Sequence, residues 1–313
     1  MLHVRVVSPA SHTGQLVETL SALPGVQNLV VLANGARRPE GDSVVFDVRD
    51  GAANPVFASL RDLDLDRDGL IAVHRVDATL DHSAGPAKRT GYLAPETAPV
   101  WDMVEATIRS GAVYAPSFFV LLTIAGLIGA VGILTNSQIL IVGAMVVGPE
   151  YNAIIAVALG ITKRDRRAVR AGLLALFWGF LAAVVLTYLF SAGIRATGVA
   201  PTTAFTHGIR PVANLINSPN VFSVVVAVLA GIVGVVSLTE SRANALIGVF
   251  ISVTTIPAAA SIGVSVAYGS WDEARGSLFQ LLLNVVLLIA VGAAGLRAQR
   301  AIWRRAPRSG SVT

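Results

Sequence analysis

Six long apolar runs fill the chain after residue 110, and they constrain the fold more than any other feature. A helix needs about 20 apolar residues to cross the hydrocarbon core of a bilayer. The runs therefore predict six transmembrane helices, at residues 117–134, 139–161, 171–194, 221–238, 243–268 and 278–296. Only 14% of the residues are charged, whereas soluble domains average about 25%.

The basic residues indicate which side of the membrane each loop faces. Five follow the second run and five follow the sixth: Lys163, Arg164, Arg166, Arg167, Arg170, and Arg297, Arg300, Arg304, Arg305, Arg308. Because cytoplasmic loops are enriched in Lys and Arg, we expect a plasma (inner) membrane protein with both termini in the cytoplasm. The isoelectric point near 10.1 then reflects these membrane flanks. No nucleic-acid partner is expected, since no aromatic residues interleave with the basic clusters.

The first 80 residues have the pattern of a small soluble domain. Period-two and β-branched segments predict strands at 2–8, 26–32, 44–48 and 70–76, and helical spacing predicts helices at 12–23 and 55–65. Turn signals stand at Asn34-Gly35 and Gly41-Asp42. The order βαββαβ predicts an α+β, ferredoxin-like domain. No secretory signal sequence begins the chain, so we expect this domain in the cytoplasm, where it could bind a small regulator.

Residues 81–112 form a Gly- and Pro-rich linker with a short amphipathic segment at 100–108. This segment is either an interfacial helix on the membrane surface or a simple connector. The membrane domain is expected at 113–298, and residues 299–313 form a basic tail.

An internal repeat runs through the membrane part. Residues 125–131 (AGLIGAV) match 230–236 (AGIVGVV), 134–137 (LTNS) match 238–241 (LTES), and 141–143 (IVG) match 246–248 (LIG), at offsets of 104–105 residues. Each copy, 113–196 and 218–298, holds three spans, and an odd number places the copies in opposite orientations. The prediction is an all-α bundle with a 3+3 inverted repeat, an architecture typical of secondary transporters.

The second and fifth spans contain helix breakers near their centres. Pro149 removes a backbone donor from the second span, and Pro257 does so in the fifth. Freed backbone groups at this depth must line a cavity or be buried in protein. The candidate substrate- or ion-binding residues are Gly148, Pro149, Glu150, Asn152, Ser252, Thr254, Thr255, Pro257 and Ser261.

Glu150 is the only ionisable residue deep in any predicted span. Carboxylates inside membranes are costly and often functional, so a role in proton or cation coupling is expected. The alternative is a structural Glu bonded to freed backbone. Weaker candidates are Ser137 and Ser241, which we expect to cap helices, and Asn284, which could bond neighbouring helices.

Three stretches resemble a known family. They are 136–160 (NSQILIVGAMVVGPEYNAIIAVALG), 237–257 (SLTESRANALIGVFISVTTIP) and 281–288 (LLLNVVLL). They resemble the domain of unknown function 389 family of bacterial membrane proteins, in an actinobacterial-type variant. The chain departs from the family pattern at Pro149-Glu150-Tyr151, where Pro-Leu-Met is common, and at Ile256-Pro257-Ala258, where Pro-Pro is common. The resemblance implies a membrane architecture and no particular activity.

Two functional classes follow from these patterns. The first is a secondary transporter of a small solute or ion, and the second is a ligand-sensing membrane protein or channel. An enzyme is not expected, because no nucleotide-binding or hydrolase motif occurs and the chain has no Cys. No cofactor or metal is expected either: the five His are scattered, and the Asp64–Asp68 run lacks the acidic twelfth residue of a calcium loop. Besides the lipid bilayer, a homodimer partner is expected.

Overall fold

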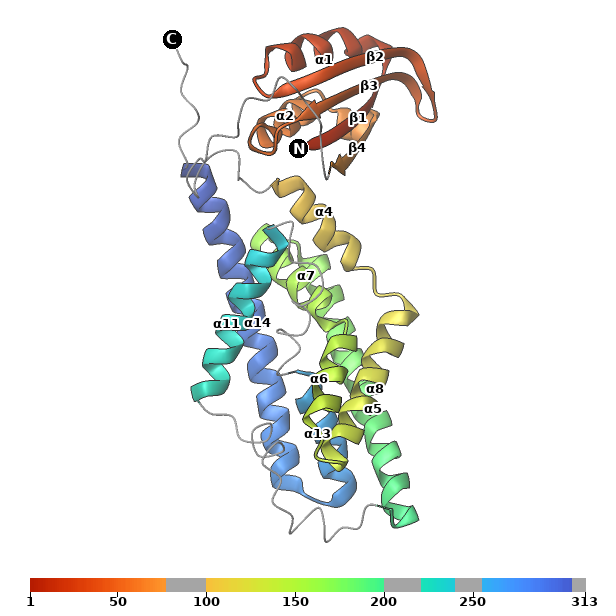
Figure 1. Ribbon diagram of the computed structural model, residues 1–313, viewed down its shortest axis with the longest axis vertical. Coiled ribbons are helices and arrows are strands. Elements are labelled where there is room, and N and C mark those ends of the chain that lie inside the picture. Colours follow the sequence, from red (N-terminus) through yellow and green to blue (C-terminus); the bar gives the residue numbers. More distant parts are fainter. Residues whose placement is uncertain (77–99, 200–220, 240–254, 306–313) are drawn as a thin grey trace. The chain divides into compact units, whose positions relative to one another are not determined.

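The computed structural model describes residues 1–76, 100–199, 221–239 and 255–305 (Figure 1). The chain forms two compact units, one built around Met1–Val104 and the other around Glu105–Arg300. The division between them falls inside one helix, α4, which runs from Trp101 to Gly111.

A four-stranded antiparallel sheet forms the first unit, in the order β2-β3-β1-β4. Its elements are β1 (Leu2–Ser8), α1 (Ala10–Ala22), β2 (Val26–Arg37), β3 (Glu40–Val48), α2 (Asp50–Asp62), α3 (Leu65–Asp68) and β4 (Leu70–Arg75). The small antiparallel sheet expected from the sequence is therefore present. Its core joins Val4 and Phe46 of the sheet to Leu16 of α1 and Leu60 of α2, all fully buried.

The turn between β2 and β3 lies later than predicted. The Asn34-Gly35 pair does not end the strand, because β2 continues to Arg37 and the register shifts between Leu32 and Ala36. Asn34 has a positive φ of 51°, and its backbone N–H donates to Asp42 Oδ1 over 2.8 Å. This bond and the Thr13 hydroxyl lower the pKa of Asp42.

The amphipathic segment expected at 100–108 is helical. Val100 and Met103 pack against the core of the first unit. The backbone N–H of Trp101 donates to Asn54 Oδ1 over 3.3 Å, and Arg61 pairs with Asp102 at 3.0 Å. The first turn of α4 thus belongs to the first unit.

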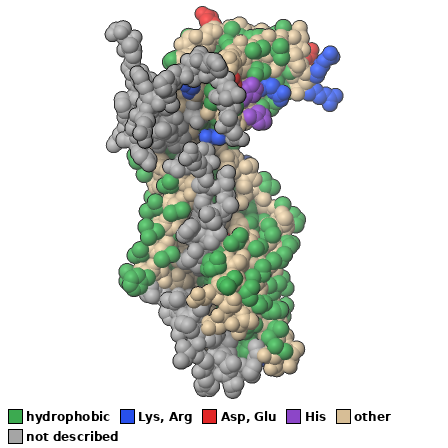
Figure 2. Space-filling model, in the orientation of Figure 1, with side chains coloured by type: hydrophobic (Ala, Val, Ile, Leu, Met, Phe, Trp, Pro, Cys, Tyr) green, Lys and Arg blue, Asp and Glu red, His purple; other side chains and the backbone are tan. Residues whose placement is uncertain are grey.

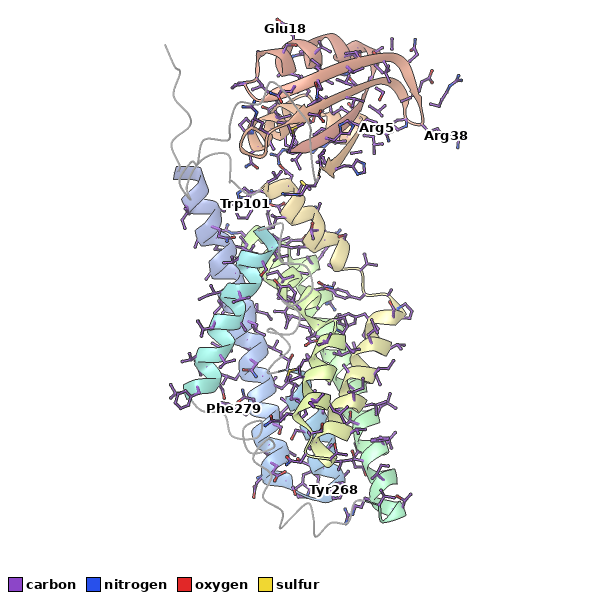
Figure 3. The ribbon with its side chains drawn as sticks, viewed as in Figure 1. Arg5, Glu18, Arg38, Trp101, Tyr268 and Phe279 are labelled. Atoms are coloured by element: carbon purple, nitrogen blue, oxygen red, sulfur yellow. The ribbon has the colours of Figure 1, made fainter. Side chains whose placement is uncertain are left out.

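The second unit is helical and strongly apolar on its outside. Its further helices are α5 (Pro116–Leu134), α6 (Gln138–Val147), α7 (Glu150–Lys163), α8 (Arg166–Thr197), α11 (Val221–Thr239), α13 (Ile256–Tyr268) and α14 (Trp271–Arg305). Figure 2 shows how densely hydrophobic side chains cover this unit. Exposed examples are Phe177 and Trp178 on α8 and Phe279 on α14, which Figure 3 labels. Exposed apolar surface on this scale is typical of helices that face lipid.

Four of the described helices are long and apolar enough to span a membrane, and there are five if the bent pair α6–α7 is counted as one span. These five match the predicted first, second, third, fourth and sixth spans. The remaining predicted span, 243–268, is described only from Thr255 onward, where α13 is apolar but shorter. Residues 243–254 of that span lie outside the described part of the chain.

Helix boundaries recur at a constant interval. Helices α8 and α14 begin 105 residues apart, at Arg166 and Trp271. Helices α7 and α13 end 105 residues apart, at Lys163 and Tyr268. This interval equals the offset of the sequence repeat.

Candidate functional site

The second apolar span is broken where the sequence predicts it. Helix α6 ends at Val147, α7 begins at Glu150, and the two axes are bent by 51°. Pro149 has no N–H for a helical hydrogen bond, which favours the break here. Gly148 is required for space: a Cβ at this position would press against the Glu150 carboxylate and lie 2.9 Å from Ile256 Cδ1.

Glu150 lies at this break and is fully buried. The Thr255 hydroxyl, also fully buried, donates to Glu150 Oε1 over 2.8 Å. Glu150 is the first residue of α7, and Thr255 immediately precedes α13. Helix N-termini carry partial positive charge and stabilise a nearby anion. The carboxylate is therefore placed where two helices begin.

The other predicted site residues occupy different positions. Pro257 lies in the first turn of α13. Ser137 caps α6, accepting a hydrogen bond from the Leu140 backbone N–H over 3.4 Å, as expected. Asn152 is exposed and lies beside Gly111. Ser241, Ser252 and Thr254 fall outside the described residues.

Ser261 and Asn284 each belong to a buried hydrogen-bonded pair. The Ser277 hydroxyl of α14 donates to Ser261 Oγ of α13 over 3.0 Å. Gln280 Nε2 donates to Asn284 Oδ1 over 3.3 Å, within α14. The sequence reading missed Ser277 and Gln280, although their spacing to Asn284 (i, i+3, i+7) places all three on one helix face.

Contacts between the two sequence copies come in crossed pairs. The Tyr151 hydroxyl of α7 donates to the Gly234 carbonyl of α11 over 2.7 Å. Moving both positions by 105 residues exchanges the copies and gives Ile256 and Gly129. A Cβ on Gly129 of α5 would lie 3.9 Å from Ile256 Cγ2 of α13.

A second crossed pair joins α7 to α14 and α13 to α8. A Cβ on Gly292 of α14 would lie 3.2 Å from Ala158 of α7. The positions 105 residues from these are Thr187 and Gly263, and a Cβ on Gly263 of α13 would lie 2.8 Å from Thr187 Cβ of α8. Each of these contacts is thus matched by a contact between the two positions that lie 105 residues away.

A groove of the second unit lies elsewhere. It has a volume of about 1190 Å³ and runs between α8 and α14, lined by apolar side chains with Arg164, Arg166 and Arg170 along its border. None of the predicted site residues lines this groove. Ile262 of α13, which follows Ser261 in the sequence, does line it. Its apolar walls suit lipid contact rather than a polar solute.

No group of three or more acidic or His side chains arranged to hold a metal occurs in the described ranges. The sequence from residue 145 to residue 290 matches the family Domain of unknown function (DUF389). No curated protein and no solved structure matches the chain. The DUF389 match begins in α6, contains both Glu150 and Thr255, and ends in α14. Both residues of the buried pair thus lie within the stretch that matches the family.

Proposed function

We propose that the chain is a secondary transporter of a small solute or ion, with its site where the α6–α7 break meets the start of α13. Glu150 couples transport to a proton or a cation. The carrying observation is the fully buried carboxylate at a helix break, bonded to Thr255 over 2.8 Å. A buried carboxylate is costly unless it is neutralised or paired. Whether Glu150 holds a proton or a cation would therefore depend on what surrounds its carboxylate.

An inverted 3+3 repeat of six spans is part of this proposal. Thr255 lies 105 residues after Glu150, so each residue occupies the other's equivalent position. A residue that contacts its own equivalent lies on a two-fold axis. The crossed contacts and the recurring helix boundaries support the same axis. Transporters with inverted repeats bind their substrate at such a repeat interface near the middle of the bilayer.

The proposed orientation places both termini in the cytoplasm of a plasma membrane protein. The support is the charge of the α7–α8 connection, where Lys163 and Arg166 stand among the basic residues. The βαββαβ unit would then regulate transport from the cytoplasmic side.

A proteoliposome assay tests the proposal. The full chain is reconstituted with a pH-sensitive dye inside, and solute-dependent proton movement is recorded. We expect Glu150→Gln to lose at least nine-tenths of this movement. Glu273→Gln, a carboxylate change in the same unit outside the site, should leave it within a factor of two. Undiminished coupled flux in Glu150→Gln would overturn the coupling role.

The competing class, a ligand sensor or channel, predicts a different result. A channel would conduct without coupling, and its flux would run only down the solute gradient. A sensor would give no flux while its soluble unit binds a ligand. Either result would replace the transporter proposal.

A further inference from the structure

The buried polar side chains of the second unit break the equivalence of the two copies. Helix α14 carries Ser277, Gln280 and Asn284 on one face, and these residues are 0%, 4% and 0% exposed. The positions 105 residues earlier on α8 are Gly172, Ala175 and Gly179, which are buried too. One copy therefore has three polar side chains where the other has none.

Helix packing does not require these polar groups. In the first copy, Gly172 packs against Ala153 and Val157 of α7, where a Cβ would lie 3.4 Å from the Ala153 carbonyl oxygen. In the second copy, Ser277 meets Ser261 on the equivalent helix, α13. The same type of helix pair thus forms with glycine and alanine alone, so the polar stripe of α14 needs another explanation.

Bonding between helices explains only part of the stripe. The Ser277–Ser261 bond joins α14 to α13, and the Gln280–Asn284 bond lies within α14. Gln280 Oε1 is buried and accepts no hydrogen bond from any residue that the structure describes. A buried carbonyl oxygen without a donor is unfavourable, and proteins normally provide one.

We propose that Ser261, Ser277, Gln280 and Asn284 form the solute-recognition element, and that the solute is small, uncharged and bears an N–H or O–H donor for Gln280 Oε1. This assignment rests on the proposed transport function. All four side chains are neutral, and a charged solute buried against them would lack a counter-charge. Glu150 does not supply one, because it holds the coupling proton or cation. The solute-recognition element thus lies on α13 and α14, and the coupling carboxylate lies at the start of α7.

Thermal unfolding of the full chain in lipid nanodiscs tests this inference. The uncharged probes are acetamide, uridine and xylitol, and the charged probes are choline and glutamate. Ligand binding to the folded state raises the unfolding temperature in a saturable manner. We expect at least one uncharged probe, and neither charged probe, to do so.

The first copy itself supplies the decisive variant. The triple change Ser277→Gly, Gln280→Ala, Asn284→Gly gives α14 the residues of α8, and it should fold and lose the shift. Gln280→Leu alone is the second variant and should weaken the probe's half-saturation at least tenfold. Ser265→Ala removes another buried hydroxyl of α13, outside the stripe, and should keep the wild-type shift.

The results separate this inference from the coupling role. Glu150→Gln should keep probe binding while losing coupled proton movement. If Glu150→Gln keeps that movement, the proposed function fails. The probe-binding result then still tests whether the stripe recognises a solute. Stabilisation by charged probes alone, a shift retained by both stripe variants, or no shift with any uncharged probe overturns the stripe's assignment.

Discussion

The Thr255 hydroxyl donates a 2.8 Å hydrogen bond to Glu150 Oε1 across 105 residues of chain. The same interval separates the matching sequence motifs and the matching helix ends. Two equivalent positions are thus in direct contact with each other, although one carries a carboxylate and the other a hydroxyl. Only one of the two matched positions therefore carries an acidic group.

The Thr255 hydroxyl should stabilise the fold and the coupling site. Thr255→Val keeps the shape of the side chain and removes the donor to a buried carboxylate. We expect a loss of about 1.5–3 kcal/mol, typical of hydrogen bonds to charged groups, measured by thermal unfolding in detergent. Thr255→Ser retains the donor and should lose less than half as much. Equal losses in both variants would show that the methyl group, not the hydroxyl, is important.

Gly148 should not tolerate a side chain. Gly148→Ala places a Cβ against the Glu150 carboxylate and 2.9 Å from Ile256 Cδ1, and overpacking of this kind costs about 1–3 kcal/mol. Gly143→Ala is the matched control on α6, because a Cβ there has nothing within 4 Å. The measurement is the unfolding temperature of each variant, and a Gly148→Ala protein as stable as Gly143→Ala would contradict the packing at the break.

If the proposed inverted repeat is correct, Arg166 and Trp271 lie on opposite sides of the membrane. Both residues begin a helix, are exposed and lie 105 residues apart. The chain has no Cys, so Arg166→Cys and Trp271→Cys each introduce a single label site. A membrane-impermeant maleimide applied to right-side-out cells should modify Trp271→Cys, and Arg166→Cys only after permeabilisation. Modification of both from the same side would exclude the inverted orientation.

Gly263 and Gly292 should differ in their tolerance of alanine. At Gly263 a Cβ would lie 2.8 Å from the backbone N of Tyr188 and the backbone O of Val184, and backbone atoms cannot move aside easily. At Gly292 the nearest contact is the Ala158 methyl at 3.2 Å. Gly263→Ala should therefore lower the unfolding temperature more than Gly292→Ala does. Gly193→Ala, with nothing within 4 Å of the new Cβ, should have the least effect.

Asp42 should make the stability of the soluble unit pH-dependent. The Asn34 N–H and the Thr13 hydroxyl lower its pKa below the ordinary value of 3.8. A carboxyl with a lowered pKa in the folded state stabilises that state above its unfolded pKa, and the contribution disappears as the pH falls through the folded pKa. Asp42→Asn should thus increase amide exchange in β2 and β3 at pH 7.

The same difference between Asp42→Asn and the wild-type chain should shrink below pH 4. Asp62→Asn, at an exposed position near the end of α2, serves as the control and should resemble wild type at both pH values. A constant difference between Asp42→Asn and wild type from pH 7 to pH 3 would contradict the linkage.

The sequence alone determined the membrane class, the order of the elements and the position of the α6–α7 break. These properties depend on local features: apolar length, period-two patterns, and a proline that cannot donate. It also named Glu150 as a candidate and gave Thr255 as one of several candidate residues in the fifth span. Local signals did not fix the turn after β2, because the Asn34 conformation is held by Asp42, eight residues further along.

Only the tertiary structure decided which candidates meet. Asn152 lies one turn from the break but is exposed, whereas Thr255 reaches Glu150 from a distant segment. Ser277 and Gln280 were not predicted as site residues, because the residues next to a polar side chain in the sequence do not show which other helix it will contact. Their meaning follows from packing, which buries them where the other copy has only glycine and alanine. Sequence periodicity sets the faces of helices, and three-dimensional packing alone determines which faces share a site.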